Sequence, residues 1–145
     1  MGNLYSQRTY DAALNVRTLA AAITSTETGA LILDLGAGLV CGDLVIDYSA
    51  MDTTTGDECY AFTLEGSPDA AFGTAGNIKA LAQLTIGGTT GLNPPNGAAD
   101  AAAGRLVIPF RNERIGTTYR YVRLLTTVSG TSATIIFAAF LAKCE

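Results

Sequence analysis

Hydrophobic side chains recur at every second position along several short segments, and this two-residue period constrains the fold more than any other feature. In segments 44–49 and 60–65, hydrophobic residues alternate with residues that include Asp47 and Glu65. Such alternation is typical of a β-strand with one face buried and the other in water. No stretch of ten or more residues has the spacing of an amphipathic helix. The pattern therefore predicts an all-β protein.

Eight segments have this strand-like character, and Gly, Pro, Asn and Asp punctuate the chain between them. They are residues 19–24, 30–35, 44–49, 60–65, 78–86, 105–110, 118–128 and 132–141. Eight short strands in a chain of 145 residues favour a single-domain β-sandwich, and a jelly roll of about eight antiparallel strands is the first candidate. An immunoglobulin-like sandwich is the alternative, although the chain lacks the tryptophan of true immunoglobulin domains. Pro109 predicts that its strand lies at a sheet edge or carries a bulge.

The two ends of the chain have different expected roles. Residues 17–145 are predicted to form the jelly-roll domain. Residues 1–16 match no strand pattern and are interpreted as an N-terminal arm, with Leu4, Tyr5 and Tyr10 among polar neighbours. Such an arm could become ordered on docking. Segment 87–104 is rich in Gly, Ala, Asn and Pro and is expected to form a long surface loop.

The amino-acid composition argues against most kinds of catalysis and cofactor binding. The chain has no histidine, so it lacks the usual general base and the commonest zinc ligand. Gly36 and Gly38 begin a dinucleotide-like motif, but Cys41 stands where the third glycine is needed. The acids around Met51 lack the pattern of a calcium loop. We therefore expect a protein that is not an enzyme and needs no metal or cofactor.

The cysteines and the net charge limit which cellular compartment and which classes of partner are expected. Three cysteines without CxxC spacing indicate free thiols in a reducing compartment. The longest apolar stretch, 133–142, is about half the ~20 residues that a membrane-spanning helix needs, so no membrane partner is expected. A formal net charge of −4 with only two lysines also disfavours nucleic acid, because phosphate binding needs a broad basic surface.

Charge is unequally divided along the chain. Residues 1–70 contain ten acids and two bases, whereas residues 71–145 contain seven bases and three acids. Such asymmetry predicts either acid–base pairing between neighbouring strands of one fold or contacts between the basic surface of one copy and the acidic surface of another.

Four arginines in the basic half are candidate partner-binding residues, together with Leu4, Tyr5 and Tyr10 of the arm. They are Arg111, Arg114, Arg120 and Arg123. One interpretation is that they pair with acids of their own chain. The other is that some are interface anchors, because Arg and Tyr are enriched at protein contacts. We expect at least one of Arg114 and Arg120 to be such an anchor.

The order of several short motifs resembles that of a known family. They are Leu-Asp-Leu-Gly at 33–36, the strand at 42–48, Phe-Thr-Leu-Glu-Gly-Ser at 62–67 followed by Phe72, Tyr-Arg-Tyr-Val-Arg-Leu at 119–124, and a closing apolar strand. Over residues 15–143 the chain is similar to the small capsid cement, or decoration, proteins of tailed bacteriophages. Those proteins are single jelly rolls that trimerise on the outside of the head.

The resemblance implies a structural virion protein. Its partners would be two further copies of itself in a homotrimer and the major capsid protein at three-fold or quasi-three-fold positions. It would be made in the host cytoplasm and end on the capsid surface. The alternative is a carbohydrate-binding β-sandwich module of a phage tail or fibre, in which Tyr5, Tyr10, Tyr60 or Tyr119 would stack on sugar rings. A small hydrolase is disfavoured by the absence of histidine.

Overall fold

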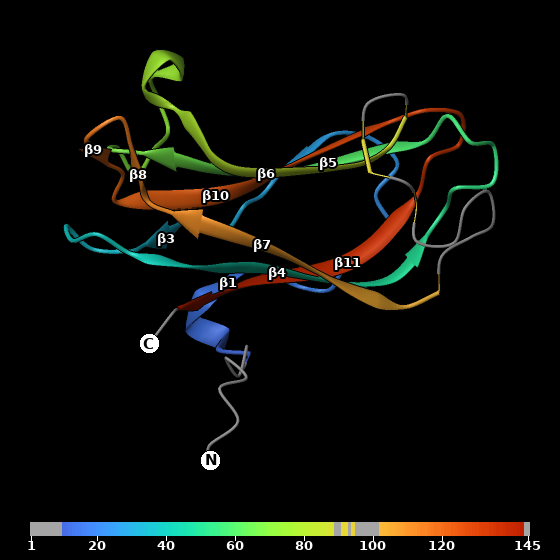
Figure 1. The fold of residues 1–145 in the computed structure, drawn as a ribbon, viewed down its shortest axis with the longest axis horizontal. Helices are drawn as coiled ribbons and strands as arrows, with labels where there is room; N and C mark the ends of the chain where they lie inside the picture. The colour runs from blue at the N-terminus through green and yellow to red at the C-terminus, as the bar shows by residue number, and fades with distance from the viewer. Residues whose placement is uncertain (1–9, 89–90, 93, 95–101, 144–145) are drawn as a thin grey trace.

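Two antiparallel sheets lie face to face in the computed structural model, which describes residues 10–88, 91–92, 94 and 102–143 (Figure 1). The β4 sheet has the order β1 (Asn15–Arg17), β11 (Ile135–Lys143), β4 (Cys41–Met51) and β7 (Gly104–Arg111). The β5 sheet has the order β2 (Glu27–Thr28), β10 (Tyr121–Ser129), β5 (Cys59–Ser67) and β6 (Lys79–Gly87), with β3 (Leu33–Asp34) also on β10. The all-β sandwich expected from the alternation is confirmed.

Short elements complete the described chain. A hairpin of β8 (Glu113–Arg114) and β9 (Thr117–Thr118) connects the two sheets. The helical elements among the described residues are two 3-10 turns, Ala12–Leu14 and Ala75–Asn77. None of the described residues belongs to a helix long and apolar enough to cross a bilayer.

The core fills the space between the sheets with the inward residues of the alternating strands. Leu44 and Ile46 of β4 are fully buried, as are Phe62 of β5 and Phe137 of β11. The rings of Phe62 and Phe137 meet edge to face across the two sheets, with 5.3 Å between centroids. Each such side chain contributes roughly 1.5–3 kcal/mol through burial, so the alternation seen in the sequence is also the main source of stability.

A second, smaller apolar cluster lies on the outer face of the β4 sheet. Val45, Phe140 and Ala142 form it and are all buried. The ring of Tyr10 meets that of Phe140 edge to face at 5.3 Å, while Tyr10 itself stays 57% exposed. Of the three arm residues singled out from the sequence, Tyr10 therefore lies against this sheet, and Leu4 and Tyr5 lie outside the described residues.

Six expected strands correspond to the six long strands of the sandwich, with ends moved by a few residues. They are segments 44–49 (β4), 60–65 (β5), 78–86 (β6), 105–110 (β7), 118–128 (β10) and 132–141 (β11). Pro109 lies in β7, which is the last strand of the β4 sheet, so its predicted edge position is confirmed. The expected loop 87–104 falls largely outside the described residues.

Two of the eight expected strands, segments 19–24 and 30–35, differ from the structure. Segment 19–24 forms no strand, and only Ile23 makes an isolated bridge, to Ile135. The first strand is instead Asn15–Arg17, whose three residues are all buried, so the expected boundary between residues 16 and 17 falls inside β1. Segment 30–35 contains only the two-residue strand β3. Strand β1 could not be predicted because its three residues are too few to display an alternating pattern, and two of them, Asn15 and Arg17, are polar.

Candidate functional site

The four candidate arginines gather at one end of the sandwich. Arg111 ends β7 opposite Cys41, the first residue of β4. Arg114 lies in the β8–β9 hairpin, which contacts β6 near its start through Ala80. Arg120 immediately precedes β10, and Arg123 is the third residue of that strand. We call this the arginine end; in Figure 1 it is the side on which β8 and β9 are labelled.

The β8–β9 hairpin projects an isoleucine from this end. Glu113 pairs with Thr118 and Arg114 with Thr117, so Ile115 and Gly116 form a two-residue loop. Both have positive φ, 52° and 74°, as in a type I′ turn, where Asn-Gly is the favoured pair. Ile115 is 92% exposed.

Three hydrogen bonds hold this hairpin in place. Gly116 N–H donates to Glu113 Oε1 at 2.7 Å, and Arg114 Nη1 donates to the carbonyl of Ala80 at 3.0 Å. Tyr119 N–H donates to the carbonyl of Asn112 at 2.7 Å, which closes the hairpin at its base. The tip is therefore presented on a fixed support.

Asn112 fixes the base of the hairpin from inside the protein. It is completely buried, and its Oδ1 accepts a hydrogen bond from Val40 N–H at 2.7 Å. Its Nδ2 donates to the carbonyls of Gly38 and Tyr119 at 3.0 and 3.1 Å. Sequence reasoning missed this residue, because an asparagine beside a hairpin reads as an ordinary turn residue.

Arg120 and Asp34 form a bidentate pair at the surface. Arg120 Nε and Nη2 donate to the two oxygens of Asp34, each at 2.7 Å. Together with a hydrogen bond from Gly36 N–H, the Arg120 guanidinium lowers the pKa of Asp34 to about 2. Both side chains are about half exposed, so this pair adds little stability at neutral pH.

Arg123 and Arg111 have different surroundings. Arg123 Nε donates to Glu65 Oε2 at 2.8 Å, with the two side chains only 20% and 15% exposed. Its guanidinium also lies 4.2 Å from the centre of the Phe72 ring. Arg111 is 59% exposed and approaches Glu113 only to 3.8 Å. Arg111 therefore keeps a charge that its own chain neutralises weakly, whereas Arg123 is packed into the surface of the β5 sheet.

The acidic and basic halves of the chain are joined by these pairs. Arg123–Glu65 bridges β10 and β5, and Arg120–Asp34 connects the start of β10 to β3. On the β4 sheet, Arg105 Nη2 donates to Asp47 Oδ2 at 2.7 Å across the β7–β4 ladder. The first interpretation of the charge asymmetry, acid–base pairing between neighbouring strands, is confirmed for these three pairs.

Two further buried ions were missed by sequence reasoning. Arg17 of β1 is 6% exposed, pairs with Glu27 Oε1 at 2.8 Å and lies over the Phe137 ring. Glu58 is 1% exposed and accepts hydrogen bonds from Thr55 and Gly56 N–H at 2.8 and 2.7 Å. Burial alone would raise the pKa of Glu58, but its hydrogen bonds outweigh that effect and the pKa is lowered. Both groups hold the fold together.

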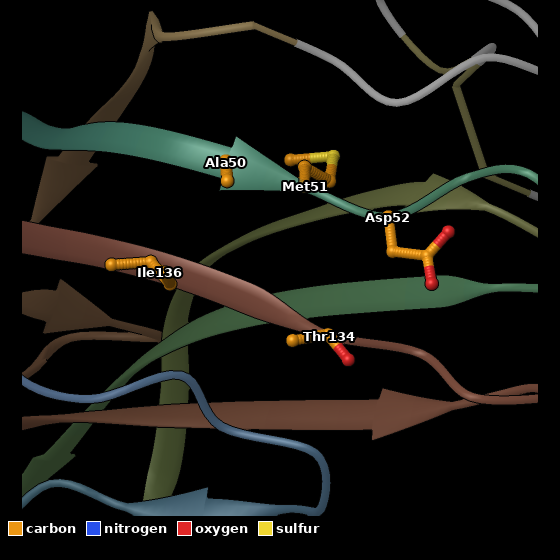
Figure 2. A pocket seen from close by; sticks show the side chains of 5 residues that line it. All are labelled: Ala50, Met51, Asp52, Thr134 and Ile136. Atoms are coloured by element: carbon orange, nitrogen blue, oxygen red, sulfur yellow. The ribbon is translucent and has the colours of Figure 1, made fainter.

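A small hollow lies at the other end of the β4 sheet (Figure 2). It has a volume of about 260 Å³ and is lined by Ala50, Met51, Asp52, Thr134 and Ile136. Among the described residues no three His, Cys, Asp or Glu side chains come together as a metal site would require. The acids of this region have structural hydrogen bonds: Asp52 with Thr54, and Asp57 with Thr131.

The tyrosines named for sugar stacking are placed differently from that expectation. Tyr60 is fully buried, and its hydroxyl donates to the carbonyl of Asp52 at 2.6 Å. Tyr119 is 7% exposed. Neither ring can offer a face to a sugar. Tyr10 is the one of these tyrosines that the described residues leave largely exposed, and Tyr5 lies outside them.

No protein-family model, curated protein or solved structure matches this chain. The candidate site is therefore defined by its geometry: a fixed hairpin with an exposed apolar tip, among arginines at one end of a rigid sandwich. Such a surface is suited to contact with protein, because hot spots combine an apolar anchor with arginine.

Proposed function

We propose that this chain is a structural virion protein that forms homotrimers and binds the outside of a phage capsid. There it would occupy three-fold or quasi-three-fold positions and join neighbouring major capsid subunits. The observation that carries the proposal is the exposure of Ile115, at 92%, on a hairpin that its own hydrogen bonds hold in place. A rigid anchor loses little entropy on docking, which favours binding to another protein.

The order of the strands also supports the jelly-roll interpretation behind this proposal. First and last strands are neighbours (β1 and β11), as are β2 and β10, β4 and β7, and β5 and β6. This nested order is the one that a long hairpin produces when it folds over on itself. A jelly roll is built in that way from two Greek keys.

The charged groups fit a protein partner better than a nucleic acid or a membrane. Asp34, Glu65 and Asp47 already neutralise Arg120, Arg123 and Arg105 within the chain, which leaves little positive charge for phosphate groups. The free thiols of Cys41 and Cys59 are compatible with synthesis in the host cytoplasm. We propose no enzymatic activity and no cofactor.

The test combines mass in solution with binding to heads. Sedimentation at micromolar concentration should give the mass of three chains, and the protein should be retained on purified heads that lack it. The matched control is Gln83→Ala, on the exposed face of β6, which should change neither result. A monomer that is not retained on heads would overturn the proposal. Retention on tails instead would favour the carbohydrate-binding alternative.

A further inference from the structure

The tip of the β8–β9 hairpin is unfavourable for the fold in two respects. Ile115 has a φ of 52°, a region that β-branched residues rarely occupy, and it exposes 92% of its surface to water. Asparagine would suit this type I′ position better. Strain and exposure of this kind do not stabilise the isolated chain. A contact with another molecule would give them a physical reason.

The hollow beside Met51 has the size and chemistry to receive such a tip. Its accessible apolar surface comes from Ala50 and Ile136, while Met51, which also lines it, is fully buried; Asp52 and Thr134 stand at its polar side (Figure 2). Its volume of about 260 Å³ is below the roughly 300–1,000 Å³ of small-molecule sites. A hollow of this size suits one aliphatic side chain better than a ligand.

The tip and the hollow of one chain cannot meet. Arg111, next to the hairpin, pairs with Cys41 at one end of β4, whereas Met51 ends the same eleven-residue strand. At ~3.3 Å per residue the two sites lie roughly 30 Å apart along the sheet. The occupant of the hollow must therefore come from another molecule.

We propose that the occupant is a second copy: Ile115 of one copy inserts into the hollow beside Met51 of the next. This inference rests on the proposed homotrimer and names its contact. A contact between two unlike surfaces is heterologous, and three such contacts close a three-fold ring when each rotates the next copy by a third of a full turn. The two surfaces are also of opposite charge, since Arg111 and Arg114 flank the tip and Asp52 borders the hollow. Such complementarity fixes orientation more than affinity.

The first test is Ile115→Asn, with Leu19→Asn as the matched control. Leu19 is also a largely exposed apolar residue, at 65%, but belongs to neither surface. Asparagine suits the turn, so I115N should fold with an unchanged circular-dichroism spectrum. It should weaken association about tenfold to a hundredfold per contact, the loss expected for one buried aliphatic side chain. Equal association constants for I115N and wild type would overturn the contact.

The second test is a pair of cysteines, Ile115→Cys with Ala50→Cys, in a chain whose Cys41, Cys59 and Cys144 are replaced by serine. Mild oxidation should give covalent species of two and three chains, and none larger. Each single-cysteine variant should stay uncrosslinked. Crosslinking of I115C alone would overturn the contact, because it would place two tips together. So would an uncrosslinked double variant that still sediments as a trimer.

The same measurements separate this inference from the proposed function. A wild-type chain that sediments as a monomer overturns both. Covalent species that continue beyond three chains support the contact but overturn the closed trimer. A trimeric I115N that no longer binds heads overturns the contact between copies and assigns the tip to the capsid.

Discussion

Arg123 and Glu65 lie directly opposite each other across the β5–β10 ladder, and their side chains form an ion pair with 2.8 Å between Nε and Oε2. The ring of Phe72 covers the guanidinium at 4.2 Å. One partner comes from the acidic half of the chain and the other from the basic half. The fold therefore uses its charge asymmetry internally here, by placing acidic and basic strands side by side.

We expect Arg123→Ala to destabilise the fold by about 2 kcal/mol. The substitution leaves the carboxylate of Glu65 largely buried without its cation and removes the contact with Phe72. Arg111→Ala is the matched control and should cost about 0–0.5 kcal/mol, because Arg111 is 59% exposed and 3.8 Å from Glu113. Urea denaturation of both variants at one protein concentration measures the difference. Equal losses would show that burial of the Arg123 pair has no energetic consequence.

The Arg120–Asp34 pair predicts a specific dependence of stability on acid. The Arg120 guanidinium and Gly36 N–H lower the pKa of Asp34 to about 2, from 3.8. Folding favours the carboxylate, so its contribution is complete above about pH 4 and is lost as the pH falls through about 2. Asp34→Asn removes that contribution at every pH. Because both side chains are half exposed, the Tm difference between wild type and D34N should be small at pH 5 and should shrink towards zero as the pH falls to 2.

The control for this acid dependence is Asp11→Asn. Asp11 caps the 3-10 turn by accepting from Ala13 N–H, and asparagine caps about as well. The Tm difference between D11N and wild type should stay small and constant over the same pH range. A D34N difference that is equally constant would contradict the assignment of the low pKa to Asp34.

Much of the sandwich could be predicted from sequence because its long strands display a period. Segments such as 44–49 and 60–65 alternate over enough residues to reveal which face is buried, and β4 and β5 follow that alternation. Acid–base pairing between strands was one of the two interpretations that the charge asymmetry allowed, and Arg123 with Glu65 is an example of it. Which arginine would meet which acid could not be predicted, because that depends on the register of the whole sheet.

The parts that could not be predicted depend on contacts far apart in the sequence. Arg17 is buried because Glu27 and Phe137 surround it, and nothing in its local sequence distinguishes it from a surface arginine. Asn112 likewise acts through residues 72 positions away, at Val40. The strain and exposure of the hairpin tip depend on the pairing of Glu113 with Thr118, which the local sequence does not reveal.

We expect Glu58 to be required for stability. Its carboxylate is buried and accepts hydrogen bonds from Thr55 and Gly56 N–H. Glu58→Ala should cost about 2–4 kcal/mol, since two donors lose a charged acceptor. Glu58→Gln keeps one acceptor oxygen and should cost about half as much. Chemical denaturation of the two variants tests this ranking, and a loss below 0.5 kcal/mol for E58A would contradict it.

The last prediction concerns Gly87, where β6 ends beside Glu58. Gly87 has a φ of 78°, and a Cβ there would come 2.1 Å from the carbonyl oxygen of Glu58. Gly56 has a similar φ of 86° but open space around it. Gly56→Ala should therefore cost only the backbone strain, about 1 kcal/mol. Gly87→Ala adds a clash with backbone and should cost about 3 kcal/mol or more.

Thermal melts of the two alanine variants separate strain from steric conflict, because the two glycines share their φ and differ in their surroundings. For a chain of this length each kcal/mol corresponds to a Tm shift of roughly 2–4 °C. G87A should melt at least about 4 °C below G56A. Equal melting temperatures would mean that the end of β6 can move away from Glu58 without loss. In that case the Glu58 carboxylate would not depend on a fixed β5–β6 junction. The loss of stability predicted for E58A would then have to come from the 53–57 loop alone.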